Sequence, residues 1–412
     1  MTALLVGSLA LLAWAAVEAA AWLLIRWHRP FFPWLITPRD AAPDIPADVV
    51  AAHAARSFDA ELGWCRRPGE QANETTEQGT VGFRIDERGR RANPGFEELP
   101  PAVACFGDSF TFCRLVDDDR TWPHHLSRET GRVTANYGVG NYGLDQALLR
   151  LERELPALEA DTVLMGVVPE TIARVHSAWK HYFEYGNTLA FKPRFTLAAD
   201  GALVHHPPAV TRPEDYAHYR MHLDRIQRLD PFYRRKFRQD LLRLPYMPRL
   251  VRRTRRHLPI LWYLSVHRLL GRPEAAFRRA FQVVLHANSR VGNALYREEE
   301  ATRLLRVLVE RFAHVCRDTG KRPVLVVLPQ PTDLPATRSS RARDRFFASL
   351  AGTLPVVDLT ADFRAHPAPS LLYVHGRLGP HASDEGNRLI ARVVGAHLEQ
   401  LAPAPHATKE FQ

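Results

Sequence analysis

Short apolar runs alternate with longer stretches of helical periodicity along much of this 412-residue chain. An apolar run of about four to eight residues between turn residues is typical of a strand covered on both faces. Apolar residues at every third or fourth position predict helices between these runs. This rhythm predicts an α/β fold with a three-layer parallel sheet. The expected strands are 103–106, 133–136, 161–168, 323–328 and 356–359, and the expected helices are 121–130, 144–158, 298–318 and 383–398.

One apolar run is much longer than a strand. Leu4 to Ile25 has about the length that crosses a bilayer, and Glu18 is the only charged residue within it. We therefore expect a single-pass membrane anchor over residues 1–28, with a buried helix as the alternative. No Lys or Arg precedes the run, whereas Arg26 and Arg29 follow it. The positive-inside rule would then place the bulk of the chain in the cytoplasm.

Residues 29–100 predict a linker and a small β-rich lead-in packed on the main sheet. Phe83 and Ile85 alternate with polar residues and precede a turn at Gly89, the pattern of a half-exposed strand.

The pattern changes between residues 171 and 296. Residues 194–205 predict a hairpin that turns at Asp200-Gly201. Residues 212–256 then hold 14 Lys or Arg against 5 Asp or Glu, so they carry nearly all of the chain's formal charge of +10. The densest part is Arg249–Arg256, which an apolar, Trp-bearing stretch follows. We expect a basic, mainly helical insertion.

Two interpretations of this basic segment remain open. A basic stretch beside an apolar one suits the surface of an anionic membrane. Alternatively, an amphipathic helix packs on the domain and exposes a solvated arginine face. No recognisable nucleic-acid-binding module accompanies the charge, so nucleic acid is not an expected partner.

The residues most suggestive of chemistry follow the first expected strand. Gly107 permits a sharp turn, and Asp108 and Ser109 follow at the carboxyl end of the strand, where open α/β sheets bind their ligands. Main-chain N–H groups near the start of a helix can stabilise a developing oxyanion. The simpler interpretation is that Asp108 and Ser109 only cap a helix.

Three stretches together resemble the SGNH (GDSL) hydrolase superfamily, in its membrane-anchored bacterial type. They are Gly107–Phe112, Asn136–Gln146 and Gly379–Arg388, in that order, and the resemblance covers about residues 59–166 and 323–401. It implies an SGNH/flavodoxin-like sheet, with Ser109 as nucleophile and His381 as general base. It also implies a catalytic domain outside the cytoplasm, against the charge argument.

The sequence departs from the family pattern around the base. The family usually carries an acid two or three residues before its histidine, where this chain has Gly379 and Leu378. Asp358 and Asp333 are alternatives from elsewhere in the chain, and spacing does not choose between them. A Ser–His dyad is therefore the expected catalytic pair.

The expected oxyanion donors differ as well. Asn141 stands where the second block of the family has a glycine, so the backbone N–H of Gly140 or of Asn141 would serve there. The third block reads Gly166-Val167-Val168-Pro169-Glu170 and lacks the family's asparagine. We hypothesise that the Asn141 side chain replaces that donor, with Asp108 as a supporting residue.

These features favour a membrane-tethered serine esterase or O-acyl(acetyl)transferase that acts on an acylated, carbohydrate-type ester. The alternative is a catalytically degenerate binding domain in a cell-surface polysaccharide assembly. The four cysteines and the histidines show no metal-ligand spacing, so neither metal nor cofactor is expected. The expected segments are an anchor (1–28), linker and lead-in (29–100), first half of the core (101–170), basic insertion (171–296), second half of the core (297–402) and tail (403–412).

Overall fold

The computed structural model describes residues 2–377 and 379–401, and these residues form two compact units. The first unit holds the chain up to Gly63 together with His176–Arg194 and Pro207–Val291. The second holds Trp64–Val175, Phe195–His206 and the chain from Gly292 onwards. The expected tail at 403–412 lies outside the described residues.

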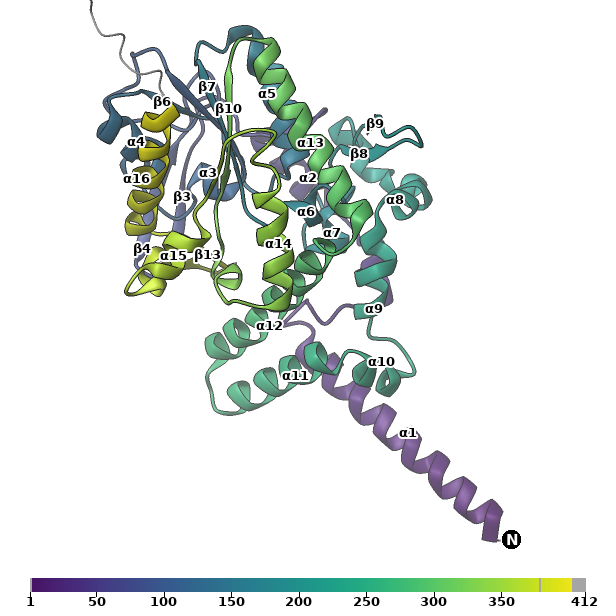
Figure 1. Ribbon diagram of the computed structural model, residues 1–412. Coiled ribbons are helices and arrows are strands. Elements are labelled where there is room, and N and C mark those ends of the chain that lie inside the picture. The colour runs from purple at the N-terminus through teal and green to yellow at the C-terminus, as the bar shows by residue number, and fades with distance from the viewer. Residues whose placement is uncertain (1, 378, 402–412) are drawn as a thin grey trace, which may run out of the picture. The chain divides into compact units, whose positions relative to one another are not determined.

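A five-stranded sheet forms the centre of the second unit (Figure 1). Its order is β11-β10-β7-β5-β6, and every neighbouring pair is parallel. The apolar runs of the sequence form these strands because both faces of the sheet are covered, so the predicted α/β class with a parallel sheet is confirmed. The bounds are β5 (Val103–Gly107), β6 (Thr134–Asn136), β7 (Thr162–Val167), β10 (Arg322–Val327) and β11 (Val356–Asp358).

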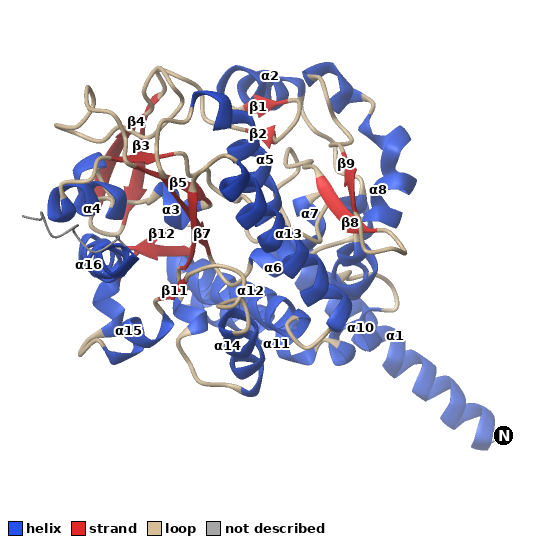
Figure 2. Ribbon diagram, turned by 45° about the horizontal axis from the view of Figure 1, so that its top comes forward, coloured by secondary structure: helices blue, strands red, loops and turns tan. Residues whose placement is uncertain are grey.

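Helices cover the sheet on both sides, as Figure 2 shows. On one side α4 (Trp122–Thr130) packs on α16 (Asp384–Leu401), and on the other α5 (Leu144–Glu154) packs on α13 (Glu299–Asp318). Each lies within a few residues of its predicted range. Ser383 precedes α16 and its hydroxyl accepts the N–H of Gly386, as expected of an N-cap. The remaining helices of this unit are α3 (Ser109–Phe112), α6 (Thr171–Arg174), α14 (Arg338–Ala348) and α15 (Thr360–Ala365).

A second, antiparallel sheet was not predicted. Its order is β13-β12-β3-β4, and it joins the lead-in strands β3 (Gln71–Thr76) and β4 (Gly79–Arg84) to a hairpin near the end of the chain, β12 (Tyr373–Gly376) and β13 (Gly379–Ala382). The junction is the pairing of Gly376 with Thr76. The predicted hairpin at 194–205 is present as β8 (Arg194–Leu197) and β9 (Leu203–His206).

The first unit is mainly helical. A single helix in the described residues, Leu4–His28, is long and apolar enough to span a membrane, by length and composition alone. A signal sequence meets the same criterion. The bounds are α1 (Thr2–His28), α2 (Ala47–Arg56), α7 (Lys180–Phe183), α8 (Leu223–Leu229), α9 (Arg238–Asp240), α10 (Tyr246–Arg252), α11 (Thr254–Leu269) and α12 (Pro273–Leu295), with two-residue strands β1 (Phe58–Asp59) and β2 (Gly63–Trp64).

A buried arginine in the lead-in organises the chain that follows α3. Arg91 is 3% exposed, and its guanidinium donates to the main-chain oxygens of Phe112 (2.6 Å), Cys113 (2.5 Å) and Val116 (2.6 Å). It also forms an ion pair with Asp118 at 3.0 Å. The carbonyls would otherwise be unpaired in a dry environment, which is costly.

We expect Arg91→Ala to destabilise the protein by about 3–5 kcal/mol, the scale for breaking a buried ion pair. The substitution leaves buried carbonyl oxygens without donors. Urea unfolding monitored by circular dichroism would measure the change. Arg88 is exposed and lies three residues away in the lead-in, so Arg88→Ala should change the free energy of unfolding by under about 0.5 kcal/mol. Equal effects of the two substitutions would contradict this role of Arg91.

Candidate active site

Ser109 is the first residue of α3, and only Asp108 separates it from Gly107, the last residue of β5. The turn requires glycine, because a Cβ at Gly107 would lie 2.1 Å from the main-chain oxygen of Gly166 in β7. The Thr111 hydroxyl donates a hydrogen bond to the same Gly166 oxygen at 3.3 Å, which fixes α3 against β7. Ser109 is therefore held at the carboxyl end of the parallel sheet, as its position in the sequence predicted.

The Asp108 carboxylate bridges three parts of the site. One oxygen accepts the N–H of Phe110 at 2.8 Å, which caps α3. The other accepts the N–H of Val168 at 3.2 Å and a guanidinium N–H of Arg174 at 3.2 Å. Asp108 thus performs the capping function of the simpler interpretation, and it also ties α3 to the end of β7.

His381 lies beside Ser109. Its Nε2 is 2.9 Å from the Ser109 hydroxyl oxygen, within the range for proton transfer between a base and a nucleophile. The ring lies against Phe110, with centroids 5.0 Å apart. His381 is carried by β13 opposite Val374 of β12, so the antiparallel sheet positions the imidazole while the parallel sheet positions the hydroxyl.

Neither alternative acid reaches His381. Asp333 is buried in an ion pair with Arg343 at 2.9 Å, and Asp358 accepts the N–H of Thr360 at 2.9 Å. The buried Nδ1 of His381 has no hydrogen-bond partner among the described residues. Gly379 begins β13, and Leu378 lies outside the described residues.

Two arginines near the site, Arg114 and Arg174, belong to no motif by which the sequence could have identified them. Burial lowers the pKa of His381 well below its ordinary value, and the charges of Arg114 and Arg174 lower it further. Arg114 pairs with Glu74 of β3 at 2.6 Å, and Arg174 pairs with Glu170 at 3.1 Å as well as with Asp108. The low pKa keeps the imidazole neutral, the form that accepts a proton.

The glycine-rich turn after β6 packs on α3. The Asn136 side chain donates to the Thr111 carbonyl and accepts the N–H of Gly138, both at 2.9 Å. A Cβ at Gly138 would lie 2.3 Å from the Phe112 nitrogen.

The predicted oxyanion residues follow in the same turn. The Gly140 carbonyl accepts the indole N–H of Trp64 at 2.9 Å, and Asn141 has a left-handed backbone with φ of 70°. Asn is among the residues that tolerate this conformation best.

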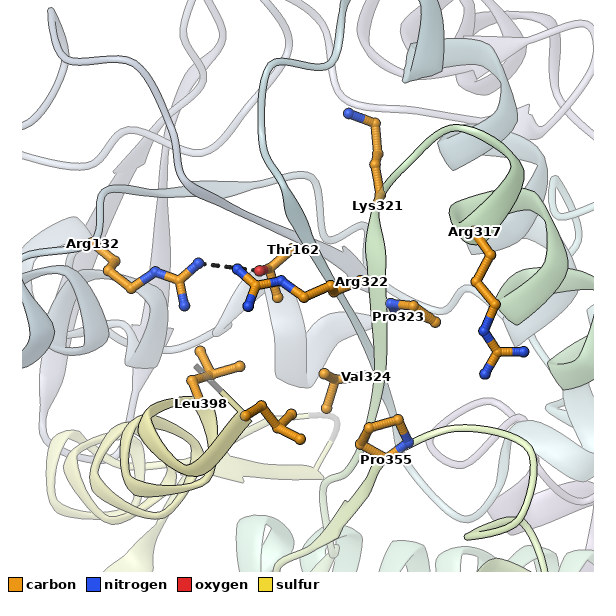
Figure 3. Close-up of a pocket in the computed structure, with 10 residues that line it drawn as sticks. Arg132, Thr162, Arg317, Lys321, Arg322, Pro323, Val324, Pro355 and Leu398 are labelled. Atoms are coloured by element: carbon orange, nitrogen blue, oxygen red, sulfur yellow. Dashed lines mark hydrogen bonds between the residues drawn. The ribbon is translucent and has the colours of Figure 1, made fainter. Parts of the chain in front are cut away.

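A cavity of about 250 Å³ lies at the opposite edge of the parallel sheet, at the amino ends of β7 and β10 (Figure 3). Its basic side chains are engaged: Arg132 donates to the Thr162 hydroxyl at 3.1 Å, and Lys321 donates to the main-chain oxygens of Leu158 and Ala160. Because parallel sheets bind ligands at their carboxyl ends, this cavity is a poor active-site candidate. Within the described residues, no group of three or more His, Cys, Asp or Glu side chains forms a metal site.

No protein-family model matches the chain, and no curated protein matches it. Among solved structures it is similar to a protein of Desulfitobacterium hafniense DCB-2 that is described as lipolytic and of the G-D-S-L family, at 12% identity and a TM-score of 0.31, covering 71% of this chain and 97% of that chain. It is also similar to the lipase/acylhydrolase of Enterococcus faecalis, at 13% identity and a TM-score of 0.33, and the match covers 74% of this chain and 100% of that chain. At these values the similarity assigns no activity to this chain.

The packing of the glycine-rich turn predicts that Gly138→Ala destabilises the protein by about 1–3 kcal/mol or more, the usual cost of overpacking. The added methyl group must displace main-chain atoms of α3. Gly140→Ala is the matched control, because the nearest atom to its added Cβ is a side-chain carbon of Arg114 at 3.9 Å. Thermal unfolding of both variants checks the difference, and equal melting temperatures would contradict the close packing.

Proposed function

We propose that this chain is a serine ester hydrolase or O-acyltransferase of SGNH type that works through a Ser109–His381 dyad. The observation that carries the proposal is the 2.9 Å separation between the Ser109 oxygen and His381 Nε2, although 272 positions separate the two residues. A hydroxyl at a strand end beside a neutral, half-buried imidazole is the arrangement that activates a serine nucleophile.

In the proposed reaction, the Ser109 oxygen attacks the acyl carbonyl as its proton moves to His381 Nε2. The tetrahedral oxyanion collapses, and the leaving alcohol takes the proton from His381. Water or an acceptor hydroxyl then attacks the acyl-serine as its proton moves to His381, and His381 returns that proton to the departing Ser109 oxygen, so that the acyl group is released as acid or as new ester. Ser109 N–H, which has no acceptor among the described residues, and the Asn141 side chain are the proposed oxyanion donors.

We further propose an acylated carbohydrate as substrate and α1 as an anchor that holds the enzyme at the membrane, outside the cytoplasm. The resemblance of the sequence to anchored SGNH enzymes supports both points. Whether the reaction is hydrolysis or transfer depends on which acceptor reaches the acyl-serine.

A second candidate function is a non-catalytic binding domain within a polysaccharide assembly. The lack of a partner for His381 Nδ1 among the described residues favours it, because a carboxylate at that nitrogen normally orients the imidazole and stabilises its charged form.

A fluorophosphonate probe distinguishes the two. The activated Ser109 oxygen should displace fluoride from phosphorus, so the purified full-length protein should gain one covalent label, detected by intact-protein mass spectrometry. Ser109→Ala should abolish labelling. Ser349→Ala removes an exposed hydroxyl elsewhere in the same unit and should label like the unmodified protein. A folded wild-type protein that does not react would reject the esterase proposal in favour of the binding domain.

The labelling rate should also stay constant as the pH falls from neutral through 6.5. A histidine with the ordinary pKa of 6.5 is half protonated at that pH, whereas the pKa of His381 is lowered. The neutral base therefore persists as the pH falls through 6.5, and the rate should stay at its neutral-pH value until the pH is well below 6.5. Stopped-time labelling at a series of pH values measures this, with Ser109→Ala as the baseline. A rate that is already halved at pH 6.5 or above would contradict the role of His381 as the base.

A further inference from the structure

The first unit contains a cluster of arginines that the proposed esterase does not use. Arg234, Arg238, Arg243, Arg249 and Arg252 line a cavity of about 260 Å³, together with Gln239 and Leu241. They come from the segment of the chain around α9 and from α10. None of these seven described lining residues carries a carboxylate, so the lining is strongly positive.

Acidic residues nearby do not neutralise this cluster. Asp240 is buried and pairs instead with Lys236 at 3.4 Å, with Arg253 at 3.5 Å and with Arg256 at 3.5 Å. Within residues 2–377 and 379–401, none of the five cavity arginines makes an ion pair. The sequence run Arg249–Arg256 is therefore divided: Arg253 and Arg256 pair inside the protein, and Arg249 and Arg252 face the cavity.

The cavity arginines lie close enough to repel one another. Desolvation lowers the pKa of Arg249, and the charges of Arg243, Arg252 and Arg238 lower it further. Such a cluster is stabilised by an anion that accepts several N–H bonds at once. Phosphate, like carboxylate, matches the forked guanidinium and accepts two N–H bonds from it at once.

The elements around the cavity also expose apolar side chains. Leu244, next to Arg243, is 71% exposed, and Val251, between Arg249 and Arg252, is 67% exposed. On α11, Leu258, Trp262 and Leu269 are exposed on one helical face. Alternating basic and apolar exposure, with a tryptophan, is the composition of a helix that lies at a lipid interface.

The same elements pack on the apolar helix α1, as Figures 1 and 2 show. The Glu18 carboxylate in α1 accepts the N–H groups of Tyr246 (2.5 Å) and Met247 (2.9 Å), at the start of α10. Ala21 and Ile25 of α1 share a buried cluster with Leu250 and Leu261. The cavity is thus built on helices fixed to α1, the one helix among the described residues that is long and apolar enough to enter a bilayer.

We propose that α10 and α11 lie in the interfacial layer of an anionic bilayer, and that the arginine cavity binds the phosphate of a phospholipid headgroup. The apolar residues enter the acyl region while the arginines contact the headgroups. This site is independent of Ser109, so it would hold the protein against its membrane whether or not the esterase proposal holds.

The test uses the full-length protein in an uncharged detergent at low ionic strength. Its melting temperature is followed as dihexanoyl-phosphatidylglycerol, dihexanoyl-phosphatidylcholine or inorganic phosphate is added. We expect the phosphatidylglycerol to raise the melting temperature with a saturable midpoint, and the other two to have little effect. A Ser109→Ala variant should bind identically.

The variant Arg243→Gln/Arg249→Gln/Arg252→Gln should shift that midpoint by about 100-fold, since each basic residue near an anionic lipid contributes about fivefold. Arg225→Gln/Arg228→Gln/Arg278→Gln removes the same charge from exposed positions outside the cavity and outside α10 and α11 and should leave the midpoint within about threefold. Should the first triple variant fail to fold, Arg249→Gln alone should still show about a fivefold shift.

Three results would overturn the proposal. Equal midpoints for the two triple variants would mean that only net charge matters. An equal effect of phosphatidylcholine would mean that the headgroup charge is not recognised. Saturation by inorganic phosphate, lost in the cavity variant, would make the cavity a site for a soluble phosphate compound and not for a lipid.

Discussion

The contacts of one carboxylate determine where the candidate nucleophile stands. Asp108 caps α3 through Phe110, accepts the N–H of Val168 at the end of β7, and pairs with Arg174 of α6. All of these groups are buried, so their bonds are made in a dry environment, where an unmade bond is most costly. Ser109 is the next residue in the chain, so the hydrogen bonds of Asp108 also fix the position of Ser109.

The fold was predictable where it depends on local pattern. The five parallel strands, for example 161–168 for β7, follow from apolar runs, and the periodic leucines of 298–318 follow from the single buried face of α13. Ser109 and His381 were singled out by their neighbours in the sequence. The 2.9 Å distance between the Ser109 oxygen and His381 Nε2 depends on the tertiary structure, so no local sequence pattern predicts it.

What escaped prediction depends on pairing between distant residues. The hairpin β12–β13 is short and rich in glycine, so it has no strand pattern, and its junction with β3 joins Gly376 to Thr76. Arg91, Arg114 and Arg174 stand in no motif, and only the fold brings the first to the carbonyls after α3 and the other two to the surroundings of His381. Spacing also could not show that Asp333 is already bound to Arg343.

The mixed origin of the site has a practical consequence for anyone who wants a smaller version of this protein. A fragment that began at residue 101 would retain all five parallel strands and would look self-sufficient by that standard. It would nevertheless remove β3, the neighbour of β12 on the side away from β13, and so expose an unpaired strand edge of the kind that favours aggregation. The smallest useful truncation therefore has to start ahead of Gln71, because β3, which begins at that residue, is the strand that borders the hairpin with the imidazole.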